Sequence, residues 1–274
     1  MTSAFPLAGK TALVTGGARR IGRAIAISLA HAGADVAITW NTSQIEASQT
    51  AAEIAALGRR SLATQCDVRS ESSVRAAISA VTSAFGRLDI LVNNAAVFAS
   101  AALESLTLDQ WDAVFDTNTR GPFLVAREAL PLLRAAHGRI VNIGSLGGIR
   151  AWAGHAHYCA SKAALHMLTQ AMAKAFAPDI SVNCVAPGWI EINDSVNEAE
   201  RMAQPEVGSE SVAPPSPAPS AGRVGSESAR FAAKTPMGRN GAAGDVAQAV
   251  LFFCTGPDFI TGQILAVDGG LTLT

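Results

Sequence analysis

The stretch TALVTGGARRIGRAIAISLAHAG (11–33) decides the fold, because it passes from a strand pattern to a helix pattern through a glycine-rich turn. The apolar run TALVT (11–15) predicts a buried strand, and the apolar spacing over 21–32 predicts an amphipathic helix. Between them, Gly16 permits a tight turn and Gly22 lets the helix pack closely on the strand. The free N–H groups of the helix then face a pyrophosphate, so the stretch predicts a nucleotide-binding unit rather than an ordinary strand-helix turn.

The alternation of strand and helix patterns continues along the chain. Further apolar runs of strand length lie at 35–40, 60–66, 88–94, 138–143, 180–187 and 263–270. Strands this apolar are buried on both faces, which predicts a parallel sheet with right-handed helical crossovers. The predicted fold class is therefore α/β, a doubly wound parallel sheet in a single Rossmann-type domain spanning 1–274.

Composition limits the partners of this chain. It has 274 residues, of which 49% are hydrophobic and 16% charged, enough for one domain with a large core. A net charge of −1 provides no basic surface for nucleic acid, and no apolar run reaches membrane-spanning length. The first ten residues lack a secretion leader, and the four cysteines are widely spaced, as in reduced proteins. We expect a cytoplasmic protein that binds a small molecule.

Three residues in the second half of the chain predict proton chemistry. Ser145 follows the strand pattern GRIVNI (138–143), and Tyr158 and Lys162 stand four apart in YCASK, on one face of a helix. Tyr158 is the only tyrosine in the chain. A phenol is a poor acid at neutral pH unless a nearby cation lowers its pKa, so Lys162 is predicted to make Tyr158 a tuned proton donor. The alternative is an exposed Tyr/Lys pair without function.

Taken together, these motifs resemble the short-chain dehydrogenase/reductase family, from about Ala8 to Gly270. The matching segments are TGGARRIG (15–22), NNAA (93–96), the serine and tyrosine 13 positions apart, APG (186–188) and VDGG (267–270). Arg20 and Ala96 stand where the family has glycine. Within the family, the chain is similar to 3-oxoacyl-acyl-carrier-protein reductases, and the resemblance implies reversible hydride transfer between a nicotinamide and a carbonyl or secondary alcohol substrate.

The resemblance also implies a catalytic tetrad of Asn118, Ser145, Tyr158 and Lys162. Ser145 would hydrogen-bond the carbonyl oxygen, Tyr158 would protonate it, and Lys162 would hold the nicotinamide ribose as well as tune the tyrosine. Asn118 either kinks a helix or, as in the family, holds a relay water through its backbone carbonyl; we favour the relay. A homotetramer or homodimer is expected by the same resemblance.

The cofactor is predicted from the end of the second strand. Enzymes that prefer NAD usually carry a carboxylate there, whereas this strand ends in TWNTS (39–43). Arg19 can face a 2′-phosphate instead, which favours NADP(H) over NAD(H). The resemblance assigns adenine contacts to Asp67 and Val68. The full set of predicted cofactor-binding residues is Gly16, Arg19, Arg20, Ile21, Gly22, Asn41, Thr42, Ser43, Asp67, Val68, Asn94, Ala95, Ala96, Tyr158, Lys162, Pro187, Gly188 and Ile190.

Two alternative functions remain open at this point. Arg20 is similar to an arginine of pteridine reductases, although those enzymes commonly carry aspartate at the position of Ser145. A non-catalytic dinucleotide sensor is the alternative of another class, but such proteins typically lose the tyrosine or the lysine. No metal is predicted, because His155 and His157 have no third ligand at suitable spacing.

The family's substrate lid falls in an unusual segment of this chain. The lid is predicted at about 191–235 and includes QPEVGSESVAPPSPAPSAGRVGSESARF (204–231). Proline, serine and alanine at this density favour an extended and flexible chain.

Overall fold

The sheet is parallel and has seven strands in the order β3-β2-β1-β4-β5-β6-β9. The computed structural model describes residues 5–191 and 221–274, with the backbone alone over 221–227. The strands are β1 (Thr11–Val14), β2 (Asp35–Trp40), β3 (Ser61–Gln65), β4 (Ile90–Asn93), β5 (Arg139–Ile143), β6 (Ser181–Pro187) and β9 (Ile264–Val267). Strand order reverses between β1 and β4, so the predicted doubly wound α/β fold is confirmed. A separate pair joins β7 (Ile190–Glu191) to β8 (Gly241–Ala242).

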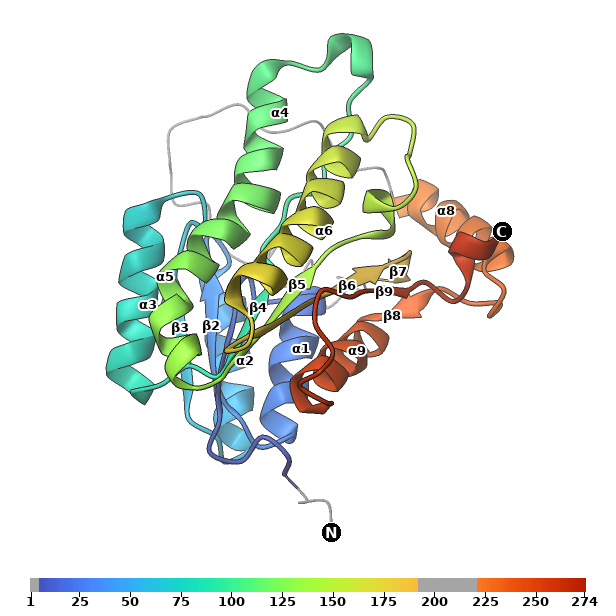
Figure 1. Ribbon diagram of the computed structural model, residues 1–274. Helices are drawn as coiled ribbons and strands as arrows, with labels where there is room; N and C mark the ends of the chain where they lie inside the picture. Colours follow the sequence, from blue (N-terminus) through green and yellow to red (C-terminus); the bar gives the residue numbers. More distant parts are fainter. Residues whose placement is uncertain (1–4, 192–220) are drawn as a thin grey trace, which may run out of the picture.

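Helices cover both faces of the sheet (Figure 1). One face carries α1 (Arg20–His31), α2 (Gln44–Ala56) and α9 (Ala243–Thr255). The other carries α3 (Glu71–Phe85), α5 (Gly121–Ala135) and α6 (Ala156–Phe176). Between β4 and β5 the chain forms α4 (Leu108–Phe115), a π-helical turn (Asp116–Arg120) and then α5.

The core lies in two layers because strand side chains alternate between the faces of the sheet. Ala12 and Val14 pack on the α1 and α9 side, whereas Leu13 between them packs on the α3 and α5 side. All three are fully buried. Because the seven strands are parallel, their carboxyl ends lie at one edge of the sheet, and the candidate site lies at this edge.

The predicted lid falls mostly outside the described residues. Of the segment at about 191–235, residues 192–220 are not described, whereas α8 (Ala221–Lys234) is helical. The prediction of an extended chain is therefore wrong over this part. The reason is the distribution of proline: the last proline of the rich stretch is Pro219, and the next is Pro236, just beyond the end of α8.

A buried carboxylate ties the beginning of β1 to the beginning of β4. The Asp89 side chain is 3% exposed, accepts a hydrogen bond from the backbone N–H of Thr11 (2.9 Å), and pairs with Lys10 (3.1 Å) and Arg87 (2.6 Å). Burial by itself raises the pKa of Asp89, but the hydrogen bonds from Arg87, Thr11 and Lys10 outweigh it and hold the pKa below its usual value.

We expect Asp89→Asn to lower the free energy of unfolding by about 2 kcal/mol at pH 7, since it removes charged hydrogen bonds to a buried site. Because the folded pKa is lowered, the contribution of Asp89 is present above its unfolded pKa of about 4 and is lost as pH falls through the folded pKa. Denaturant unfolding followed by circular dichroism should show the two proteins converging in acid. A constant difference across the pH range would contradict the ionic role.

Candidate active site

Thr15 and Asn94 clasp the glycine-rich turn to the end of β4. Thr15 Oγ1 accepts hydrogen bonds from the backbone N–H groups of Asn94 (3.0 Å) and Ala95 (3.1 Å). In return, Asn94 Nδ2 donates to the carbonyl oxygens of Thr15 (2.9 Å) and Gly16 (3.0 Å). The amide nitrogen of Asn94, a residue predicted to bind the cofactor, thus helps to shape the turn.

Glycine is required at Gly22, where the turn meets the helix. A Cβ atom at Gly22 would lie 2.2 Å from the carbonyl oxygen of Gly16 and 2.5 Å from Asn94 Nδ2. Gly16 itself has φ +62°, a left-handed conformation that glycine adopts without strain. Arg20, at the position where the family has glycine, also has positive φ, 53°. The family preference for glycine there is thus explained by backbone geometry.

The N-terminus of α1 has no side-chain cap. Arg19 is the residue before the helix, in an extended conformation, and its side chain makes no capping hydrogen bond. The first backbone N–H groups of α1, starting with those of Arg20, Ile21 and Gly22, carry the positive end of the helix dipole. This end of the helix has the chemistry of an anion site.

The end of β2 lies against the same turn. The backbone N–H of Gly17 donates to the carbonyl oxygen of Thr39 (3.0 Å), and that of Gly16 donates to Thr39 Oγ1 (3.2 Å). Asn41 and Thr42, just beyond this strand, are exposed, and Ser43 is half-buried. The structure therefore brings the predicted 2′-phosphate residues to the turn that carries Arg19.

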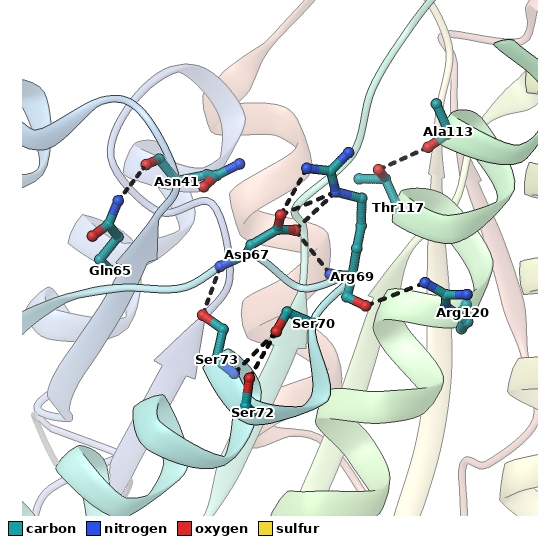
Figure 2. A network of polar contacts seen from close by, with 10 residues as sticks. All are labelled: Asn41, Gln65, Asp67, Arg69, Ser70, Ser72, Ser73, Ala113, Thr117 and Arg120. Atoms are coloured by element: carbon teal, nitrogen blue, oxygen red, sulfur yellow. Dashed lines mark hydrogen bonds and ion pairs between the residues drawn. The ribbon is translucent and has the colours of Figure 1, made fainter. Parts of the chain in front are cut away.

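The ends of β2 and β3 form a polar network shown in Figure 2. Gln65 Nε2 donates to the carbonyl oxygen of Asn41 (3.1 Å), and Arg69 holds the carboxylate of Asp67 with a shortest contact of 2.7 Å. The hydrogen bond from Arg69 is the main cause that lowers the pKa of Asp67. Val68 is buried beside Gly121, where an added Cβ would lie 2.9 Å from Val68 Cγ2. Asp67 and Val68 thus lie beyond a strand end, as an adenine contact requires.

The remaining cofactor positions lie on the far side of the strand-order reversal. Pro187 ends β6 opposite Val267, and the next backbone N–H, of Gly188, donates to the carbonyl oxygen of Val267 (3.0 Å). A side chain at Gly188 would collide with Asp268. Ile190 begins β7, and Ala96 is exposed beyond β4. All of them lie at the carboxyl edge of the sheet.

Ser145, Tyr158 and Lys162 lie together beyond the end of β5. Ser145 is 4% exposed, its Oγ accepts a hydrogen bond from the backbone N–H of Gly147 (3.0 Å), and its interaction with Tyr158 by itself lowers the pKa of the phenol. The buried ammonium of Lys162 donates to the carbonyl oxygen of Ile143 (2.8 Å) and lies 5.9 Å from the centre of the Tyr158 ring. The structure therefore brings together the three residues predicted to carry proton chemistry.

The prediction that Tyr158 has a lowered pKa is wrong for this structure. Burial raises the pKa of Tyr158, and the hydrogen bond with Ser145 opposes this only in part. Burial also lowers the pKa of Lys162 to about 8. Desolvation disfavours both charged forms, so it outweighs the attraction between ammonium and phenolate on which the sequence argument depended.

Asn118 lies in the π-helical turn between α4 and α5. Its side chain is completely buried, donates to the carbonyl oxygen of Val97 (3.0 Å) and to Ser161 Oγ (3.1 Å), and accepts from the N–H of Val97 (2.9 Å). Asn118 thereby ties the loop after β4 to α6, next to Lys162. The relay through its backbone carbonyl stays a prediction.

Sequence reasoning missed His166, which supports the turn carrying Ser145. Burial and the nearby Lys162 lower the pKa of His166 to about 4, so the ring is neutral, and Nε2 lies 3.5 Å from the backbone N–H of Ser145. Side chains at Gly144 and Gly148 would lie 2.3 and 2.6 Å from this ring. The glycines of GSLGG (144–148) were the signal in the sequence that a large side chain packs against this turn, because glycine leaves space for such a neighbour.

Sequence profiles place the chain in a known group of enzymes. The profile described as short chain dehydrogenase matches residues 10–203, and that of Enoyl-(Acyl carrier protein) reductase matches 216–272. The chain belongs to the short-chain dehydrogenase family. It is 37% identical over 268 residues to the short-chain dehydrogenase/reductase FrzI of Cladobotryum sp, covering 97% of this chain and 96% of FrzI. It is 34% identical over 267 residues to the 3-oxoacyl-[acyl-carrier-protein] reductase FabG of Staphylococcus aureus, covering 96% of this chain and 98% of FabG.

Solved structures of this family have the same fold. A putative short-chain alcohol dehydrogenase from Sinorhizobium meliloti superposes with a TM-score of 0.84 at 32% identity, covering 99% of each chain. A blue fluorescent protein from a metagenomic library, in complex with NADPH, has a TM-score of 0.80 at 34% identity, covering 97% of this chain and 99% of that one. The chain is thus a family oxidoreductase that acts on CH–OH groups, similar to FabG.

The single tyrosine makes its titration directly measurable by ultraviolet absorbance. We expect tyrosinate of the free enzyme to appear above the ordinary pKa of about 10, because burial raises the pKa of Tyr158. Lys162→Met should leave this transition nearly unmoved, since Lys162 loses its proton at about pH 8 and is neutral where the tyrosine titrates. Tyr158→Phe is the control and should abolish the signal. A tyrosinate transition whose midpoint lies well below pH 10, and moves to higher pH in Lys162→Met, would instead support the prediction that Lys162 lowers the pKa of Tyr158.

Proposed function

We propose that this protein is an NADP(H)-dependent carbonyl reductase or alcohol dehydrogenase, similar to 3-oxoacyl-acyl-carrier-protein reductases. The observation that carries the proposal is the meeting of Ser145, Tyr158 and Lys162 at the carboxyl edge of the sheet, where the glycine-rich turn also lies. A nicotinamide cofactor supplies the hydride chemistry when bound. The protein's own groups orient the carbonyl and move its proton.

The protonation states of the site suit reduction. A tyrosine with a raised pKa is protonated at neutral pH, so Tyr158 can give its proton to the carbonyl oxygen as hydride reaches the carbonyl carbon. The product is an alcohol, and the tyrosinate recovers its proton from solvent. Ser145, buried beside Tyr158, stabilises the negative charge that develops on the carbonyl oxygen. Lys162, with a pKa of about 8, is a cation at neutral pH and stabilises the transient tyrosinate.

The residues present fit a phosphorylated dinucleotide. The uncapped start of α1 would hold the pyrophosphate, and Gly22 lets the helix pack closely against the turn at Gly16 and Asn94. Arg19, with Asn41, Thr42 and Ser43 nearby, would hold a 2′-phosphate, because positions 41–43 contain no carboxylate to repel it. NADP(H) is therefore proposed over NAD(H).

The two alternative functions have less support. A dinucleotide sensor does not need the buried contact between Lys162 and Ile143 or the placement of Tyr158 beside Lys162. A pteridine reductase is suggested by Arg20, but Ser145 stands where those enzymes commonly carry aspartate.

We also propose that the enzyme is a cytoplasmic homotetramer or homodimer. The edge strand β9 carries the exposed Leu265, and the neighbouring Phe252 and Phe259 are also exposed, which suits a contact between copies. All four cysteines are free and buried, as expected in a reducing compartment. Among the helices that the structure describes, none could cross a membrane.

Tyr158→Phe tests the reaction. We expect NADPH affinity to stay within about twofold and carbonyl-dependent NADPH oxidation to fall by a factor of about 10² to 10⁴, as when a general acid is removed. NADPH affinity is measured by fluorescence titration, and turnover by NADPH absorbance over a panel of ketones, quinones, sugars and pterins. Turnover close to wild type would remove Tyr158 from the mechanism. Binding without turnover of any substrate by the unmodified protein would favour the sensor.

Arg19→Ala tests the cofactor. It should weaken NADPH binding about tenfold or more and leave NADH binding unchanged, because it removes a charged partner of the 2′-phosphate only. Arg23→Ala is the matched control, since Arg23 lies in the first turn of α1, just after Arg19, but pairs with Glu53. Equal losses for the two cofactors in Arg19→Ala would show that Arg19 does not select the phosphate.

A further inference from the structure

Tyr158 belongs to a closed cluster of four rings, here called the aromatic cluster: Phe98, Trp152, His155 and Tyr158. Phe98 meets Tyr158 edge-on (ring centres 4.8 Å apart) and stacks on His155 (4.6 Å). Trp152 lies parallel to Tyr158 and edge-on to His155, at 6.2 Å from each. Phe98 is 61% exposed, although large apolar side chains are usually buried. The catalytic hydroxyl group is therefore carried by a largely apolar wall.

A hollow of 660 Å³ lies directly beside this wall, and Trp152 lines it. Its lining residues lie in the segments that lead into α4 and α6. A hydrogen bond from the N–H of Ala101 to the carbonyl oxygen of Gly154 (2.9 Å) joins these two segments. Figure 1 shows where α4 and α6 lie in the fold. The space exists because most of its lining residues are small. They are Ala101, Ala102, Ala151, Ala153, Gly154 and Ala156, with Ser100, Leu103, Glu104 and Trp152. Its volume is in the range of small-molecule sites.

The charge of the hollow limits its occupant. Glu104 is its one charged lining residue among the described parts of the chain. The adjacent Arg150 is directed elsewhere, because its guanidinium donates to the carbonyl oxygens of Leu271 and Thr274, both at 2.9 Å. An anionic group in the hollow would meet a carboxylate and no cation, whereas an uncharged ring would meet tryptophan and alanine.

We propose that the hollow holds the body of the substrate, and that the substrate is an uncharged aryl ketone or aldehyde. This inference rests on the proposed function, because the carbonyl group must reach Ser145 and Tyr158 while the aromatic body lies along Trp152. Each buried aromatic ring gains apolar contact and stacking on this wall. Glu104 at the hollow selects against carboxylate-bearing analogues.

A panel of matched ketones tests the substrate class. The compounds are acetonaphthone, butanone, methyl acetylbenzoate, its anionic parent acetylbenzoate, and acetoacetyl-coenzyme A, each with NADPH at low salt. We expect kcat/KM to be about tenfold or more higher for acetonaphthone than for butanone, and likewise for the methyl ester over the acid. Glu104→Gln should raise kcat/KM for the acid about threefold and leave the ester unchanged. A preference for the acid or for the coenzyme A thioester would overturn the proposal.

Filling the hollow tests its location. Ala153→Trp should raise KM for acetonaphthone about tenfold, and leave KM for butanone and the affinity for NADPH unchanged. Ala55→Trp, which adds the same side chain to the exposed surface of α2, is the control. Binding of acetonaphthone to the NADP⁺ complex, measured by calorimetry, should be weakened in the first variant only.

The outcomes separate this inference from the proposed function. If no carbonyl compound is turned over but acetonaphthone binds and Ala153→Trp weakens that binding, the proposed reaction fails while the aryl site stands. If butanone is reduced as efficiently as acetonaphthone, or if Ala153→Trp has no effect on the naphthyl compound, the reductase stands and the aryl site is wrong.

Discussion

The fold and the candidate site both depend on the clasp between Thr15 and Asn94. β1 and β4 are the central neighbours at which strand order reverses, and this clasp joins their ends through four hydrogen bonds of 2.9 to 3.1 Å. The clasp holds the glycine-rich turn so tightly that Gly22 has no space for a methyl group. A phosphate-binding helix end and the loop that leads to the aromatic cluster are thereby held at one edge of the sheet.

Burial is the second constraint, and it acts on the ionisable groups of the site. Lys162 lies in the interior with a carbonyl oxygen as its hydrogen-bond acceptor, and His166 lies beside it as a neutral ring. Desolvation lowers the pKa of Lys162 and that of His166, and raises that of Tyr158. Tyr158 therefore stays protonated at neutral pH, as a proton donor in carbonyl reduction must be.

Small residues create the space that the larger functional groups use. Gly144 and Gly148 leave space for the ring of His166, and the alanines around Ala153 leave a hollow beside Trp152. Arg20 is the opposite case, a large side chain with a left-handed backbone where the family has glycine, at a cost of roughly 1 to 2 kcal/mol. These positions show that backbone geometry and side-chain volume, as well as reactive groups, shape this edge of the sheet.

The sequence by itself determined the strand and helix alternation, the glycine-rich turn, and the identities of Ser145, Tyr158 and Lys162. It could do so because these features repeat at short range: strand runs, helical spacing and motif spacing are local, and parallel strands necessarily end at one edge. Only the tertiary structure decided the pKa direction of Tyr158, the place of His166, and the aromatic cluster that joins Phe98 to Tyr158. Those properties depend on desolvation and on contacts between segments far apart in the chain. A local pattern such as GSLGG (144–148) indicates that space is left for a neighbour, but does not identify the neighbour.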